Sequence, residues 1–205
     1  MNFKHEVYRK SFHILLLIFP ITYCFLGKWP SLIIFASLTT LVVSLDYFRR
    51  KNPKINNLFV KAFGLILRDS EKTGEKFCGA SYVGIAACIV FLLFKKEFAV
   101  TAFAILAISD ALASLIGTRY PSRPFFEKSI NGSLAFGLSA FIILIVSGLF
   151  FHQTAWYYFF GTFAVFCVTM FEARPSFVEI DDNFIIPVGF ATIITFFDLV
   201  LNYNY

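Results

Sequence analysis

The feature that most constrains this chain is a series of apolar blocks, each long enough to cross a lipid bilayer. A helix of about 17–25 apolar residues spans the roughly 30 Å hydrocarbon core. The mean hydropathy of +0.73 is far above that of a water-soluble domain. Seven blocks meet this length requirement: residues 11–27, 31–48, 78–94, 98–117, 132–151, 155–171 and 184–201.

These blocks predict an all-α fold, because a helix satisfies its own backbone hydrogen bonds inside the bilayer. We expect a polytopic membrane bundle of about seven transmembrane helices, with residues 1–205 forming a single integral membrane domain. An eighth block, residues 55–67, is too short to span the membrane and carries Lys61. We therefore expect it to form a helix that lies at the membrane interface.

The positive charges indicate an orientation. Fifteen of the 18 Lys and Arg residues fall before the first block or in the loops after the second, fourth and sixth blocks. Only Lys28, Lys95 and Lys96 fall on the other side. Because cytoplasmic loops are enriched in Lys and Arg, the N-terminus is predicted to be cytoplasmic and the C-terminus outside. We expect the protein in a bacterial inner membrane.

The acidic residues follow the basic ones, since only Glu97 and Asp198 of the 13 Asp and Glu residues fall on the outer side. Ionisable groups crowded at the edge of hydrocarbon are costly, which indicates a functional site at the cytoplasmic surface. The net charge of +5 suits anionic lipid headgroups or nucleotide phosphates. A nucleic-acid partner is not expected, because the basic residues are juxtamembrane and form no known nucleic-acid motif.

Four polar residues share one helical face where the first block begins. Glu6, Arg9, Lys10 and His13 are separated by three or four residues, which brings their side chains to the same side of a helix. Arg9 and Lys10 are also typical of simple membrane anchors, but an anchor does not need His13. The face is therefore a candidate for binding phosphate, with His13 as a candidate proton acceptor.

Asp110 lies inside the fourth block, about 10 Å from its cytoplasmic end. An unpaired carboxylate at that depth is expensive. We expect Asp110 to pair with a cation, to bind Mg²⁺ or to be protonated. Small residues at helical spacing, Ala113 and Gly117, let another helix or a ligand approach the same face.

Two further segments carry candidate ligands. Lys128 and Ser129 directly precede the fifth block, and Gly132 and Ser133 begin it. A helix start with free N–H groups, hydroxyls and a Lys is a candidate phosphate site, although an ordinary helix cap uses similar residues. The loop before the seventh block supplies carboxylate and amide oxygens, which Mg²⁺ prefers as ligands. A solvated acidic loop without a metal would have a similar sequence. These oxygens belong to Glu172, Asp182 and Asn183.

The order of these motifs resembles a family of CTP-dependent lipid kinases that includes dolichol kinase, phytol kinase and the CTP-using diacylglycerol kinase of yeast. The resemblance covers nearly the whole chain. One position departs from it, since Asn131 stands where the family usually has Glu. The matching elements are Glu6/Arg9-Lys10/His13, Gly79-Ala80-Ser81-Tyr82, Asp110-Ala111-x-Ala113-x-x-x-Gly117, Lys128-Ser129-x-x-Gly132-Ser133, Glu172 and Asp182-Asn183-x-x-x-Pro187.

The resemblance implies transfer of the γ-phosphate of CTP to the hydroxyl of a membrane lipid alcohol: a polyprenol or dolichol, a diacylglycerol or a phytol-like alcohol. It implies Mg²⁺ held by Asp110, Asp182 and Asn183, and catalytic roles for Asp110, His13 and Glu172. The implied nucleotide-binding residues are Arg9, Lys10, Lys128, Ser129, Gly132 and Ser133.

Other functions remain open at this point. A phosphatidate cytidylyltransferase would use the same CTP and Mg²⁺ but attack the α-phosphate to make CDP-diacylglycerol. A small transporter is a third possibility, although transporters tend to place ionisable groups near the membrane midplane. A structural scaffold would need neither Asp110 nor His13. The acceptor lipid, the choice of CTP over ATP and the oligomeric state are not determined by the sequence.

Overall fold

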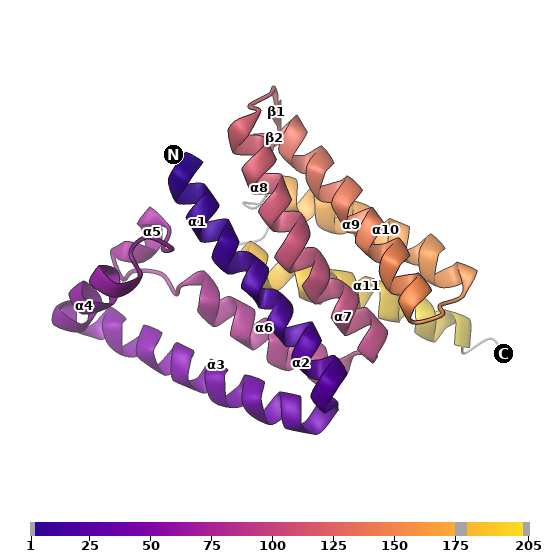
Figure 1. Ribbon diagram of the computed structural model, residues 1–205, viewed down its shortest axis with the longest axis horizontal. Helices are drawn as coiled ribbons and strands as arrows, with labels where there is room; N and C mark the ends of the chain where they lie inside the picture. The colour runs from indigo at the N-terminus through magenta and orange to yellow at the C-terminus, as the bar shows by residue number, and fades with distance from the viewer. Residues whose placement is uncertain (1–2, 175–179, 203–205) are drawn as a thin grey trace.

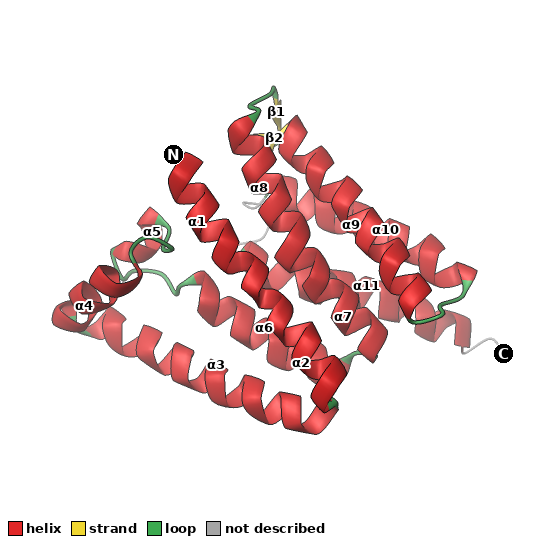
Figure 2. Ribbon diagram, in the orientation of Figure 1, coloured by secondary structure: helices red, strands yellow, loops and turns green. Residues whose placement is uncertain are grey.

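The computed structural model describes residues 3–174 and 180–202, and nearly all of this part of the chain is helical (Figures 1 and 2). The elements are α1 (Phe3–Ile14), η1 (Leu15–Leu17), α2 (Ile18–Leu26), α3 (Lys28–Lys51), α4 (Pro53–Phe63), α5 (Asp69–Lys72), α6 (Gly79–Leu93), α7 (Lys96–Ala104), η2 (Ile105–Ser109), α8 (Asp110–Arg119), β1 (Pro124–Phe125), β2 (Lys128–Ser129), α9 (Ile130–Phe150), α10 (Ala155–Ala173) and α11 (Asp182–Asn202).

Six helices of the described residues are long and apolar enough to cross a membrane. The first combines α1, η1 and α2 over Glu6–Leu26, and another combines α7, η2 and α8 over Lys96–Arg119. The predicted block 78–94 is the apolar helix α6, but its 15 residues are fewer than the other spans have. The structure therefore supports a polytopic helical protein, while the count of seven spans and the orientation stay predictions.

One predicted helix has different bounds in the structure. The interfacial helix predicted at 55–67 is α4, which begins earlier because Asn52 caps it and Pro53 occupies its first turn. It ends at Phe63, four residues before the predicted end. Besides the helices, β1 and β2 form a short antiparallel hairpin before α9, which leaves the predicted all-α class in place. Such short strands carry too little periodicity to be predicted.

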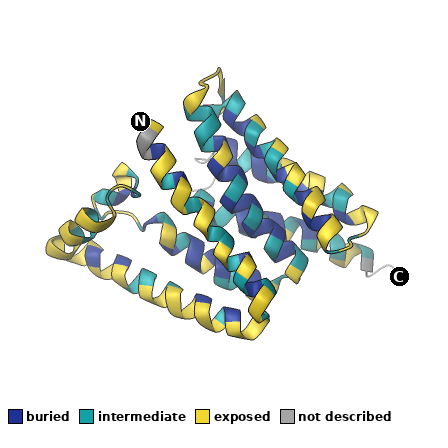
Figure 3. Cartoon of the chain, in the orientation of Figure 1, coloured by how far each residue is buried: buried dark blue, intermediate teal, exposed yellow. Residues whose placement is uncertain are grey.

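The packed core lies among α6, α7, α9, α10 and α11 (Figure 3). Phe91, Phe103, Phe136 and Phe190 are fully buried there, so aromatic side chains fill most of the space between these helices. The α1–α2 helix and α3 add Tyr23 and Phe35 to this core but are the least buried spans, since only 17% of the most apolar stretch of each is buried. Much of their apolar surface is therefore exposed.

A buried arginine connects α3 to the segments that follow it. Arg49 donates to Asp46 Oδ1 at 2.5 Å and to the carbonyls of Glu71 at 2.8 Å and Lys76 at 3.2 Å. The other oxygen of Asp46 accepts a 2.6 Å hydrogen bond from Ser81 of α6. Because Arg49 is fully buried, this network replaces its lost hydration and ties the α4–α5 region to the bundle.

Candidate functional site

Polar side chains from distant parts of the sequence meet where α1, α8 and the start of α11 come together. Lys10 of α1 donates to Asp110 Oδ2 of α8, and both residues are almost fully buried. His13 Nε2 lies 2.8 Å from Asn183 Oδ1 of α11 and 3.4 Å from Asp110 Oδ2. The fold thus joins residues of three predicted segments into one cluster of Lys10, His13, Asp110 and Asn183, which we call the central cluster.

A local irregularity precedes Asp110 in its helix. The π-helical turn η2 covers Ile105–Ser109 and ends directly before Asp110. Such turns add one residue to the helical repeat and occur frequently at functional sites. The extra residue therefore shifts the helical register directly before Asp110, whose buried carboxylate faces α1.

Arg68 supplies a charge that the sequence interpretation did not assign to the site. It donates to Asp181 Oδ2 at 2.9 Å and to Asp182 Oδ1 at 2.8 Å. Burial and the charge of Asp182 raise the pKa of Asp181 to about 6, against the opposing effect of Arg68. Asn183 Nδ2 donates to Asp181 Oδ1 at 2.6 Å, which leaves the amide oxygen of Asn183 facing His13.

A second ion pair joins the hairpin to α10. Lys128 Nζ lies 2.8 Å from Glu172 Oε1, and Ser133 Oγ lies 3.4 Å from Glu172 Oε2. Burial alone would lower the pKa of Lys128, but the carboxylates of Glu172, Asp110 and Asp182 raise it overall. Lys128 is thus within electrostatic reach of the central cluster, and the predicted residues from α1, α8, α10, α11 and the hairpin lie in one neighbourhood.

Ser129 and Gly132 have structural partners at the start of α9. The Ser129 hydroxyl accepts a 3.1 Å hydrogen bond from the backbone N–H of Gly132, as a helix cap does. A Cβ at Gly132 would lie 2.9 Å from the carbonyl of Ala113, so the missing side chain allows α8 and α9 to approach closely. Asn131 donates to the carbonyl of Tyr120 at 2.9 Å. A nucleotide-binding role for Ser129 and Gly132 stays a prediction.

Glu6 is a buried residue to which the sequence interpretation gave no role of its own. It is 1% exposed and accepts hydrogen bonds from Arg9, at 2.6 Å, and from Ser114 of α8. Its second oxygen, Oε2, is buried and has no partner among the described residues. The three-residue spacing to Arg9 was the available signal for this pair, whereas the contact with Ser114 depends on the fold.

A cavity of about 310 Å³ adjoins the central cluster. Its wall comes from α1, α3, α4, α6 and the segments around α5, and most of the side chains that line it are apolar. Six charged or strongly polar residues take part in its wall, namely Arg9, Lys10, His13, Arg68, Glu71 and Asn183. The site therefore combines a charged region with an apolar compartment.

The chemistry of the oxygen donors suits Mg²⁺ held together with a nucleotide. Asp110 and Asn183 oxygens approach the same nitrogen of His13, and Asp182 is adjacent to Asn183 in the chain. No group of three or more His, Cys, Asp or Glu side chains in the described residues forms a metal site by itself. Mg²⁺ commonly uses only one or two carboxylates and completes its shell with substrate phosphates and water. Asp110, Asp182 and Asn183 fit that pattern.

Comparison with known proteins identifies relatives over most of the chain. An uncharacterised protein of Rickettsia prowazekii is 31% identical over 204 residues, which cover 98% of both chains. The chain therefore belongs to the same family as that protein. An uncharacterised protein of Methanocaldococcus jannaschii is 31% identical over 203 residues and 92% of both chains.

One relative has a named activity. CTP-dependent diacylglycerol kinase 1 of Schizosaccharomyces pombe is 29% identical over 153 residues, covering 72% of this chain and 69% of that kinase. The chain is thus a distant relative of a CTP-dependent lipid kinase. No family model and no solved structure matches the chain.

Proposed function

We propose that this protein is a Mg²⁺-dependent kinase that transfers the γ-phosphoryl group of CTP to the hydroxyl of a membrane lipid at the cytoplasmic surface. The observation that carries the proposal is the buried Lys10–Asp110 pair, which lies beside both an apolar cavity and the Lys128–Glu172 pair. The relationship to the Schizosaccharomyces pombe kinase supports the same reaction class and the same nucleotide.

The residues can divide the work of phosphoryl transfer, which consists largely of positioning and charge stabilisation. Lys10, Arg9 and Lys128 would bind the nucleotide phosphates, with the N–H groups and hydroxyls at Ser129, Gly132 and Ser133 helping at the start of α9. Asp110, Asp182 and Asn183 would hold Mg²⁺, which neutralises charge on the phosphates when it is bound.

In the proposed reaction the acceptor oxygen attacks the γ-phosphorus while the bond from that phosphorus to the β–γ bridging oxygen breaks. CDP leaves, and the hydroxyl proton passes to a basic group at the site. His13 and Glu172 are the candidates for handling this proton. Lys10 is held against Asp110 until a phosphate competes for it, so nucleotide binding would exchange one ion pair for another.

The proposal is tested with purified protein in detergent, Mg²⁺, a mixed lipid extract and CTP labelled at either the γ or the α position. We expect the γ label in lipid and CDP as the other product. Appearance of the α label in lipid, with release of pyrophosphate, would instead identify a cytidylyltransferase. Protein that labels no lipid and binds no CTP would contradict both and favour the transporter. The labelled lipid also names the acceptor among polyprenols, diacylglycerol and phytol-like alcohols.

A further inference from the structure

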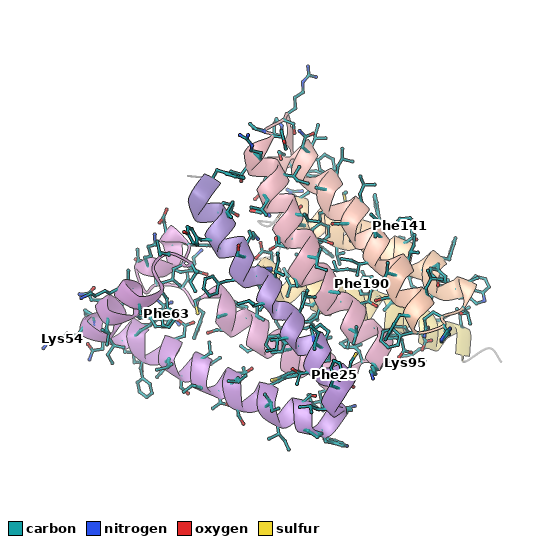
Figure 4. All side chains as sticks on the ribbon, in the orientation of Figure 1. Phe25, Lys54, Phe63, Lys95, Phe141 and Phe190 are labelled. Carbon is teal, nitrogen blue, oxygen red and sulfur yellow. The ribbon has the colours of Figure 1, made fainter. Side chains whose placement is uncertain are left out.

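The cavity beside the central cluster opens to the outer surface of the bundle. Phe12, Leu45 and Phe63 line it, and they are 53%, 48% and 47% exposed, respectively. They lie on α1, α3 and α4, respectively, and Figure 4 shows Phe63 near one edge of the molecule. Because these side chains are about half exposed, the apolar rim lies at the surface of the bundle rather than in the protein core, as suits contact with an apolar partner.

The other side of the cavity has the opposite character. Arg9, Lys10, His13 and Asn183 form part of its wall and belong to, or border, the central cluster. An occupant that satisfies both regions is amphipathic, with a small polar end at the cluster and a hydrocarbon chain that passes the rim. A volume of about 310 Å³ is at the lower end for small-molecule pockets, so only the polar end and the first part of a chain fit inside.

The hydrogen bonds around His13 leave one of its ring nitrogens available as an acceptor. Because Asn183 Nδ2 donates to Asp181, Asn183 presents its oxygen to His13 Nε2, so Nε2 carries the hydrogen of this contact. Asp110 Oδ2 lies on the same side, 3.4 Å from Nε2. In the neutral ring the hydrogen on Nε2 leaves a lone pair on Nδ1. Nδ1 is buried and has no partner among the described residues.

We propose that this cavity, bounded by α1, α3, α4 and α6, holds the acceptor lipid, with its hydroxyl donating a hydrogen bond to His13 Nδ1. The chain then leaves across the rim formed by Phe12, Leu45 and Phe63. This inference rests on the proposed function, which makes the lipid the phosphoryl acceptor. It adds where that lipid binds and which side chain contacts its hydroxyl. It also predicts that recognition depends on the hydroxyl-bearing end, because most of the chain lies outside the protein.

Lipid binding is measured first, without nucleotide, using a diacylglycerol that carries a photoreactive diazirine midway along one chain. We expect its cross-links at Phe12, Leu45 or Phe63, as mapped by mass spectrometry. The matched probe with the hydroxyl converted to a methyl ether cannot donate to Nδ1 and should cross-link several-fold less. Cross-links that map only to α9 or α10, or equal labelling by the two probes, would overturn the inference.

Kinetics with matched variants test separately the position of the lipid chain at the rim and the contact of its hydroxyl with His13. Phe63→Trp narrows the rim and should raise the lipid KM about tenfold with the CTP KM unchanged. Phe141→Trp adds the same bulk to an exposed position on α9, outside the cavity, and should change neither constant. An equal response of the two variants would contradict the placement of the chain.

His13→Ala should lower kcat on the order of 100-fold through misplacement of the hydroxyl, and it should reduce cross-linking at the rim several-fold, as the methyl ether does. His13→Asn, whose amide oxygen can lie near the position of Nδ1, should recover part of this loss. Recovery by His13→Gln alone would instead assign the contact to Nε2.

If γ label enters lipid but the probe maps elsewhere, this inference fails and the kinase stands. If the probe maps to the rim but no phosphoryl transfer occurs, the cavity stands and the kinase fails.

Discussion

The two ends of the bundle contain similar components in different arrangements. At the end that holds the central cluster, Lys10, Asp110 and Glu172 are at most 3% exposed and pair with residues from other elements. At the opposite end Lys95 and Asp198 lie 2.7 Å apart, but their side chains are 50% and 25% exposed. These charges at the first end are thus buried and interdependent, whereas those at the second remain partly exposed.

The opposite end also has a cavity, of about 210 Å³, lined by Tyr157, Gln153 and Asp198. Tyr157 meets Thr101 at 2.8 Å, which satisfies a buried hydroxyl without any charge. A cavity and an ion pair therefore do not by themselves distinguish a site. The distinguishing property is the burial of several opposite charges at once, which is costly in stability and is tolerated where the groups serve a purpose.

The largest expected effect is on catalysis and separates the two ends directly. Asp110→Asn should lower transfer of the γ label from CTP to lipid at least about 100-fold, because the buried carboxylate is lost from the nucleotide site. Asp198→Asn makes the same change at the opposite end and should keep activity within about twofold. Thermal unfolding in detergent checks that both variants are folded. Normal turnover by folded Asp110→Asn would remove the central part of the proposal.

The next effect compares a buried arginine with its exposed neighbour. Arg49→Met leaves the fully buried Asp46 without its cation and should reduce the free energy of unfolding by about 3–5 kcal/mol. Arg50 is exposed and donates to the Glu75 carbonyl at 2.8 Å, so Arg50→Met should cost about 1 kcal/mol or less. Denaturant titration of both proteins in the same detergent measures the difference. Equal midpoints would show that the Arg49 network is not needed to hold the α4–α5 region.

A smaller effect tests the close contact of α8 with α9. Gly132→Ala puts a Cβ 2.9 Å from the Ala113 carbonyl, and the resulting shift of the helices should cost about 1–3 kcal/mol. Gly189→Ala is the matched control, since its Cβ would meet Val168 at an ordinary 3.7 Å. The control should be neutral or stabilising, because Ala favours helix by up to about 1 kcal/mol. If both variants lowered the melting temperature by the same amount, the packing role of Gly132 would be contradicted.

The smallest effect concerns the solvated pair at the opposite end. Lys95→Met should change the free energy of unfolding by less than about 1 kcal/mol, as for other exposed ion pairs. Lys128→Met leaves Glu172, which is 2% exposed, without its cation and should cost more. Denaturant midpoints of the two variants provide the measurement. A larger loss for Lys95→Met would reverse the proposed difference between the ends.

Much of the helical architecture follows from local properties of the sequence. Six of the seven predicted spans correspond to helices long enough to cross a membrane, because hydropathy and helical periodicity act over neighbouring residues. The same local signals could not set the length of α6, the end of α4 at Phe63, or the hairpin of β1 and β2. Those features depend on which turns and contacts the rest of the chain supplies.

The sequence by itself determined that this is a helical membrane protein and that a carboxylate such as Asp110 requires a partner. Only the tertiary structure decided that the partner is Lys10, 100 residues away, and that His13 meets Asn183 across 170 residues. It also brought Arg68 to Asp181 and Asp182 and opened an apolar cavity beside them. The physical reason is that hydrophobic burial acts on each segment separately, whereas pairing of buried charges depends on how the segments pack together.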